Sequence, residues 1–171
     1  MTGSQRGDAR RFCLDVIKEF YGTDYRPDWH ADLDSLTSDD PRCWFSSQNS
    51  GAFWVVQDAV GDIIATAGLY ILRWKPNLVA ALAGRYPEPE TIPQLVRVYV
   101  RGDQRGRGIG VWLHELAEAE IIQRGDRILY LHASAGTPAT LKFWLGRGFA
   151  EFANAEGTAH FDKSLRATAD S

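Results

Sequence analysis

An arginine and two glycines stand at the spacing Arg105-x-x-Gly108-x-Gly110 in a short polar segment of the sequence. The segment follows a strand-like run rich in β-branched residues, Leu95–Val100, and precedes a run with helical periodicity. The first amides of a helix lack intrahelical partners and carry the positive end of its dipole. An anion can contact such amides directly at glycine, which has no Cβ. The spacing predicts a phosphate-binding loop, formed by Arg105, Gly106, Arg107, Gly108, Ile109 and Gly110.

The spacing also separates this loop from two other phosphate-binding patterns. The GxxxxGK[ST] pattern of nucleotide hydrolases is absent from the sequence, so nucleotide hydrolysis is the weakest interpretation. The GxGxxG pattern of dinucleotide sites needs a glycine where Val111 stands. A glycine-rich turn that only starts a helix is the remaining alternative. The succession of strand, loop and helix favours the phosphate site over that alternative.

Length and charge exclude several classes of protein. The chain has 171 residues, of which 44% are hydrophobic, and this suits one globular domain. Its formal net charge is −3, which gives no basic excess for nucleic acid. The amino-terminal residues have no apolar signal-peptide core, and no apolar run is long enough for a membrane span. We therefore expect a cytoplasmic protein that binds neither nucleic acid nor membrane.

The cysteines indicate neither a disulfide framework nor a metal site. The chain has only Cys13 and Cys43, which are far apart in sequence. Two such residues are typical of reduced, partly buried thiols. We expect no metal.

The periodicity predicts an alternation of helices and strands along the chain. The expected helices cover residues 8–21, 32–36, 108–124 and about 138–148, and the expected strands cover residues 52–57, 63–74, 95–100, 127–134, 149–154 and 158–165. The long connection 75–93 holds four of the seven prolines and a helical turn in 78–84. Strand alternation places Val96, Val98 and Val100 on one face of the central strand.

The loop spacing and this order of elements resemble the GNAT superfamily of N-acetyltransferases. The stretches FWLGRGF, residues 143–149, and HFDKSL, residues 160–165, resemble further features of the family. The resemblance implies an α/β (α+β) GNAT fold with a mixed, mostly antiparallel central sheet, splayed at two parallel strands and flanked by helices. It covers residues 9–165, and we expect a single domain over residues 1–171.

The resemblance implies acetyl-CoA as co-substrate. By position, the backbone of Val98, Tyr99 and Val100 would pair with the pantetheine arm, and the amides of residues 105–110 would hold the pyrophosphate. Thr137 stands where the family often has a pantetheine-contacting asparagine. Trp144 stands where the family usually has the tyrosine that acts as general acid. We therefore interpret Trp144 as a core or cofactor-stacking residue.

The acceptor amine must lose a proton before it attacks the thioester, at a cost of about 4–5 kcal/mol for an alkylammonium at pH 7. A general base is therefore expected. The position of the family's usual glutamate holds Gln94, which cannot take a proton. Glu90, with its neighbour Glu88, and His132 are the candidates that remain. The glutamates also suit solvated loop positions, and His132 also suits a hydrogen-bonded core position.

The region that the resemblance assigns to the acceptor amine is rich in aromatic and acidic residues. They are Trp29, Trp44, Trp54, Trp74, Asp28, Asp32, Asp34, Asp39 and Asp40. Aromatic rings with carboxylates suit a cationic amine. Core packing and helix capping are the competing interpretation of these residues.

The leading functional prediction is N-acetylation of a primary amine on a small molecule, by direct attack in a ternary complex. One alternative is a CoA-binding module with little or no catalysis, favoured by the missing glutamate and tyrosine. The other is acetylation of a protein or peptide amine. Dimers are common in the family, and the sequence leaves a homodimer open.

Overall fold

The computed structural model describes residues 3–38 and 41–165. The main elements in chain order are α1 (Gly3–Tyr21), α2 (Ala31–Leu36), β1 (Ala52–Gln57), β2 (Ile63–Ile71), α3 (Pro76–Leu82), β3 (Pro93–Val100), α4 (Ile109–Arg124), β4 (Ile128–Ser134), α5 (Pro138–Gly146), β5 (Ala150–Ala155) and β6 (Thr158–Ser164). Short 3-10 turns lie between them: η1 (Ser47–Asn49), η2 (Leu72–Trp74), η3 (Pro89–Thr91) and η4 (Gly102–Gln104).

In the described part of the chain, six strands form one sheet in the order β1-β2-β3-β4-β6-β5. All neighbouring strands are antiparallel except β3 and β4. These two parallel strands share one pair in the described residues, Gln94 with Tyr130. The sheet therefore splays between β3 and β4, and the predicted mixed α/β fold is confirmed.

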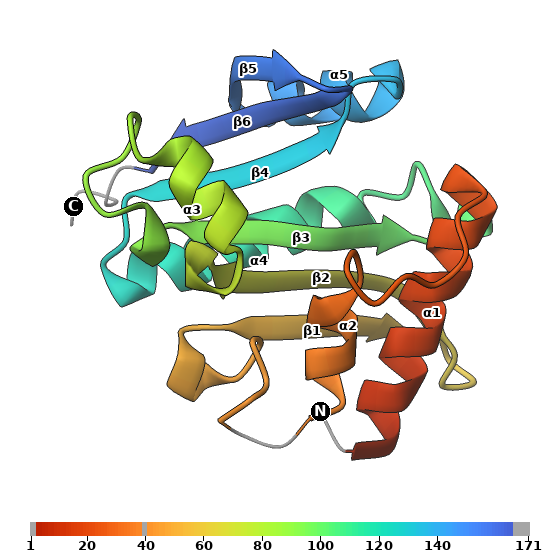
Figure 1. The fold of residues 1–171 in the computed structure, drawn as a ribbon. Helices are drawn as coiled ribbons and strands as arrows, with labels where there is room; N and C mark the ends of the chain where they lie inside the picture. Colours follow the sequence, from red (N-terminus) through yellow and green to blue (C-terminus); the bar gives the residue numbers. More distant parts are fainter. Residues whose placement is uncertain (1–2, 39–40, 166–171) are drawn as a thin grey trace, which may run out of the picture.

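Helices cover both faces of the sheet (Figure 1). On the face toward the viewer lie α1, α2 and α3, while α4 runs behind β2 and β3. The main core lies on the α4 side, where Ala117 and Ile121 pack with Leu129, Leu131 and Trp144. Burial of these apolar side chains is the principal force that fixes the two halves of the sheet.

Several predicted boundaries were wrong. The second strand of the hairpin ends at Ile71, not at Trp74, because residues 72–74 form a 3-10 turn in which Lys75 N–H bonds the carbonyl of Leu72. The helical turn in the long connection is α3, which begins at Pro76, a residue suited to the first turn of a helix. The central strand begins two residues early, at Pro93, and the first helix begins five residues early, at Gly3.

The expected alternation along the central strand was also wrong, because a β-bulge interrupts β3 at Arg97. The register shifts between the pairs Thr66–Tyr99 and Gly68–Val96. Arg97 has φ +53°, in the left-handed region, and its carbonyl accepts a 2.9 Å bond from Thr66 Oγ1. Val98 and Val100 therefore pack toward α4, while Val96 packs in the cluster on the opposite face.

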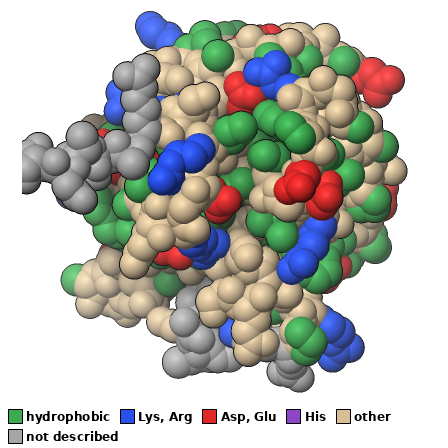
Figure 2. Space-filling view, turned by 90° about the vertical axis from the view of Figure 1, so that its left-hand side faces the viewer, with side chains coloured by type: hydrophobic (Ala, Val, Ile, Leu, Met, Phe, Trp, Pro, Cys, Tyr) green, Lys and Arg blue, Asp and Glu red, His purple; other side chains and the backbone are tan. Residues whose placement is uncertain are grey.

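Charged side chains of both signs lie close together on the surface. Figure 2 shows the face at the left of Figure 1, where Lys and Arg side chains lie near Asp and Glu side chains, with hydrophobic ones between them. No helix in the described residues is long and apolar enough to span a membrane.

The cysteine thiols give a first prediction. Cys13 and Cys43 are buried, and burial raises the pKa of the Cys13 thiol to about 12. Only a thiolate reacts readily with disulfide reagents. We expect the native protein at pH 7.5 to consume almost no aromatic disulfide reagent within minutes, and the urea-unfolded protein to react at both cysteines. Rapid reaction of the native protein would contradict the burial of these residues.

Candidate active site

A cleft of about 730 Å³ opens where β3 and β4 diverge. Its walls come from β3, β4, the start of α4, one side of α5 and the end of α1. Most of the predicted cofactor residues line it, namely Val98, Tyr99, Val100, Arg105, Gly106, Gly108, Ile109, Gly110, Thr137 and Trp144. Arg107, also predicted, does not line the cleft. The structure therefore brings residues from four separate segments to one cavity.

The glycine loop takes a backbone that only glycine adopts easily. Gly106 has φ +74°, and Gly108, the residue that caps α4, has φ +82°. A Cβ placed on either residue would have no protein atom within 4 Å. The space in front of the loop is open, so the first amides of α4 can receive an anion there.

The two loop arginines supply positive charge near this space. Arg105 lies over the ring of Phe20 at 4.1 Å, and its Nε donates to the carbonyl of Val100 at 3.1 Å. Arg107 Nη1 donates to Gln104 Oε1 at 2.5 Å. Within the described residues, neither arginine is within ion-pair distance of a carboxylate. Their charge is therefore available to a phosphate group.

The splay leaves backbone groups of β3 without a strand partner. Beyond the Gln94–Tyr130 pair, the described residues of β3 form no further ladder pair with β4. Val98, Tyr99 and Val100 lie along this edge and line the cleft. An extended amide-bearing ligand can pair with such an edge as an added strand. The carbonyl of Val100 is in part occupied, because it already accepts from Arg105.

The two candidate bases lie in different places. His132 lines the cleft on β4, two residues beyond the point where the strands meet. Neighbouring protein atoms displace water from the His132 ring, and this desolvation, together with the charge of His160, lowers the pKa of His132 to about 4. The side chain is open to the cleft, where water weakens this shift, but the ordinary histidine pKa of about 6.5 already leaves the ring mainly neutral at pH 7.

Glu90 is exposed on η3 and does not line the cleft. The structure therefore brings only His132, of the two candidates, to the loop and strand residues.

Trp144 contributes both to the core and to the cleft wall. Its side chain is 7% exposed and makes edge-to-face contacts with Phe143 at 4.8 Å and Phe149 at 5.5 Å. Thr137 precedes α5, and its hydroxyl forms no hydrogen bond that caps the helix.

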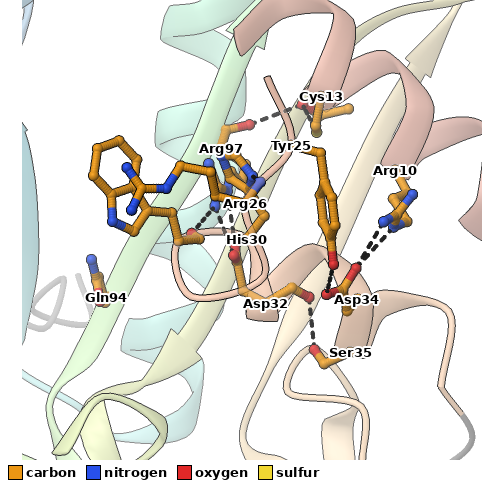
Figure 3. A network of polar contacts seen from close by, with 12 residues as sticks. Arg10, Cys13, Tyr25, Arg26, His30, Asp32, Asp34, Ser35, Gln94 and Arg97 are labelled. Atoms are coloured by element: carbon orange, nitrogen blue, oxygen red, sulfur yellow. Dashed lines mark hydrogen bonds and ion pairs between the residues drawn. The ribbon is translucent and has the colours of Figure 1, made fainter. Parts of the chain in front are cut away.

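A buried ion pair lies beside the cleft (Figure 3). Arg97 binds Asp32 through two bonds, Nε to Oδ2 at 2.8 Å and Nη2 to Oδ1 at 2.7 Å. The same guanidinium donates to the carbonyl of Trp29 and to the hydroxyl of Tyr99. Burial alone would raise the pKa of Asp32, which is 1% exposed, but the charge and hydrogen bonds of Arg97 lower it. The carboxylate is thus ionised and held by the protein itself.

The other acidic residues proposed for the acceptor side are also paired, in the part of the chain that the structure describes. Asp28 lies 3.2 Å from Arg26, whose guanidinium covers the ring of Trp29. Asp34 binds Arg10 at 2.8 Å and Tyr25 at 2.6 Å. Asp39 and Asp40 lie outside the described residues. Because arginines already neutralise these carboxylates, they give little support to a cationic acceptor.

Two aromatic residues of the site are not predicted from the sequence. Phe20 and Tyr21, 46% and 48% exposed, lie at the cleft where α1 ends. The helical periodicity of residues 8–21 places both on an apolar stripe and so favours a core position. The signal that separates them from the core is their position in the last turn, next to Gly22.

Solved structures with this fold are numerous. An acetyltransferase from Staphylococcus aureus Mu50 has a TM-score of 0.73 and 17% identity, covering 97% of this chain and 96% of its own. The PaiA N-acetyltransferase of Thermoplasma acidophilum, solved with coenzyme A, has a TM-score of 0.67 and 13% identity, covering 96% of both chains. Ribosomal-protein-alanine N-acetyltransferase from Brucella melitensis has a TM-score of 0.66 and 17% identity, covering 96% and 97%.

The search of curated protein sequences gave no match. The family model "Acetyltransferase (GNAT) family", in contrast, matches residues 14–149, which include the splayed strands, the glycine loop and α4. This chain belongs to the GNAT family of acetyltransferases.

Proposed function

We propose that the protein transfers an acetyl group from acetyl-CoA to a primary amine of a small molecule. The observation that carries the proposal is the single cleft that joins the glycine loop at one end to His132 at the other, along the free edge of β3. The loop suits a pyrophosphate, and the strand edge suits the amides of pantetheine. The thioester would then lie near the point where β3 and β4 meet.

The reaction needs the two substrates in one complex. The amine nitrogen attacks the thioester carbon and the carbonyl π electrons move to oxygen. These electrons then re-form the C=O bond as the C–S bond breaks. The amine loses its proton to water, and the sulfur leaves as a thiolate, whose conjugate thiol has a pKa around 8.5 by analogy with cysteine. Trp144 has no acidic proton to give, so we propose that the thiolate takes its proton from water.

Residues 83–93 favour a small acceptor over a protein. Tyr86 and Arg85 each bind Oδ2 of Asp162 on β6 at 2.7 Å, and Arg85 lies 3.8 Å over Phe152. These contacts fix the connection against β5 and β6, and we propose that it closes the acceptor side to an extended peptide. We also propose that the activity is cytoplasmic and that the closing strands offer a surface for a homodimer.

Release of free CoA thiol tests the proposal. Purified protein is incubated with acetyl-CoA and, one at a time, with amino acids, polyamines, aminoglycosides and a peptide with a free amino terminus. We expect thiol release that depends on one class of small amine, with the acetylated product identified by mass spectrometry. Binding of acetyl-CoA without amine-dependent release would favour the CoA-binding module. Release with the peptide alone would favour a protein acceptor.

The two candidate bases are expected to differ in effect. We expect His132→Ala to lower kcat about 100-fold, within the range for a group that acts on the reacting atoms. Glu90→Gln should change kcat less than about twofold, because Glu90 is exposed and outside the cleft. Steady-state kinetics with the best amine measures both. A large loss in Glu90→Gln with none in His132→Ala would contradict the placement of the chemistry at His132.

A further inference from the structure

Gln94 lies beneath the cleft, at the point where the parallel strands meet. It is 1% exposed, does not line the cavity, and pairs across the strands with Tyr130. Its amide nitrogen lies 3.2 Å from Nδ1 of His132, two residues beyond Tyr130 on β4. The buried amide of Gln94 is thus close enough to form a hydrogen bond with Nδ1 of the His132 ring.

The donor and acceptor roles in this contact fix the position of a proton. An amide nitrogen only donates, so Nδ1 of His132 must offer its lone pair. The neutral ring then carries its proton on Nε2. In the described residues, reversing the amide would leave both of its N–H donors without partners, whereas the present orientation leaves one N–H and the carbonyl oxygen Oε1 without partners. Orphaned N–H groups are the rarer and costlier case, so the orientation with the nitrogen toward His132 is favoured.

The hydroxyl of Tyr130 also lies near Nδ1 of His132. It is 3.3 Å from this nitrogen and 2.7 Å from Nδ1 of His160. The shorter contact engages the hydroxyl chiefly with His160, which leaves the amide of Gln94 as the nearer donor to Nδ1 of His132.

We propose that Gln94 is a positioning residue that holds His132 in its Nε2–H form, so that the ring offers the cavity a hydrogen-bond donor and not a basic lone pair. The role of that donor rests on the proposed function. As the amine attacks, negative charge develops on the thioester oxygen, and a fixed N–H beside it stabilises that charge. The proton stays on His132 throughout, and the amine proton leaves to water. His132 thus acts as an electrophile in place of the expected base.

The tautomer of His132 can be measured directly, and the measurement does not require enzymatic activity. Nitrogen-15 spectra of the histidine rings distinguish a protonated Nε2 from a protonated Nδ1, and the His132 signals are assigned by their loss in His132→Gln. At pH 7 we expect wild-type His132 to be neutral with its proton on Nε2. A proton on Nδ1, or on both nitrogens, would overturn the proposal even if acetyl transfer were established. A protein without transferase activity would leave this test intact.

Gln94→Glu tests the cause. A carboxylate accepts and cannot donate, so we expect Nδ1 of His132 to become protonated, and kcat to fall about 30-fold while KM for acetyl-CoA stays within about twofold. The matched control is Gln123→Glu on an exposed position of α4, which should alter neither signal nor rate. If Gln94→Glu does not fold, the nitrogen-15 reading of the wild-type protein still decides the tautomer, since a proton on Nδ1 would rule out a donor role for Gln94. An unchanged Nε2–H signal in the folded variant would refute the role of Gln94.

Discussion

Replacing Gly108 by valine should raise the dissociation constant of acetyl-CoA about 100-fold. A valine side chain would occupy the open space in front of the first amides of α4, and a β-branched residue resists φ +82°. Loss of one or two charge-assisted hydrogen bonds to phosphate costs about 3 kcal/mol, which corresponds to that factor. Isothermal titration of each variant with acetyl-CoA measures the change.

Gly125→Val is the matched control. Gly125 ends the same helix, has φ +92°, and likewise leaves open space around its Cα, since a Cβ placed there would meet no protein atom within 4 Å. Gly125 does not line the cleft. Its variant carries the same backbone strain at the opposite end of α4, so it should lose stability and keep its affinity for acetyl-CoA. Equal affinities for wild type and Gly108→Val would show that the loop does not hold the pyrophosphate.

Replacing Asp32 by alanine should lower the free energy of unfolding by about 3–5 kcal/mol, because it leaves Arg97 buried without its carboxylate. That is a large part of the roughly 5–15 kcal/mol that is usual for a domain. Asp34→Ala, on the same helix, removes an ion pair whose side chains are 30% and 39% exposed, and should cost below about 1 kcal/mol. Urea unfolding at pH 7 measures both values. Similar losses in the two variants would contradict the special role of the Asp32–Arg97 pair.

The same pair gives a pH dependence with a definite sign. Because the folded pKa of Asp32 is lowered, its ionisation stabilises the fold fully above the unfolded value of about 3.9. The stabilisation is lost as the pH falls through the folded pKa. The difference in unfolding free energy between wild type and Asp32→Ala should therefore be constant above about pH 5 and shrink below about pH 4.

The sequence predicts the local elements around the cleft well and the contacts between distant residues poorly. The glycine loop and its flanking strand and helix are local features, set by residue types close to one another in the chain, and the structure places them as expected. The bulge at Arg97 is different, because it depends on Thr66 and Asp32, which lie 31 and 65 residues away. No pattern within β3 itself marks that interruption.

The pairing of charges also cannot be predicted from the sequence. Asp28, Asp32 and Asp34 together suggest a surface for a cation, yet each binds an arginine of the chain. Arg26 is near in sequence to its partner, whereas Arg10 and Arg97 come from α1 and β3.

Gln94 illustrates the same limit for the candidate catalytic side chains. From the sequence alone, a glutamine at this position indicates only that the family's usual glutamate base is missing. In the folded chain, its amide contacts His132, the candidate that remains, from 38 residues away. That contact depends on the parallel pairing of β3 with β4, which the sequence predicts without its register.

Titration of the wild-type protein with acetyl-CoA tests the central claim most directly. The claim is that the cleft between β3 and β4, with the loop at 105–110, is the binding site of the acetyl donor. We expect binding with a dissociation constant on the order of micromolar, saturating at one ligand per chain and competed by free CoA. An absence of heat at millimolar acetyl-CoA, with the protein shown to be folded, would contradict the assignment of the loop and the function built on it.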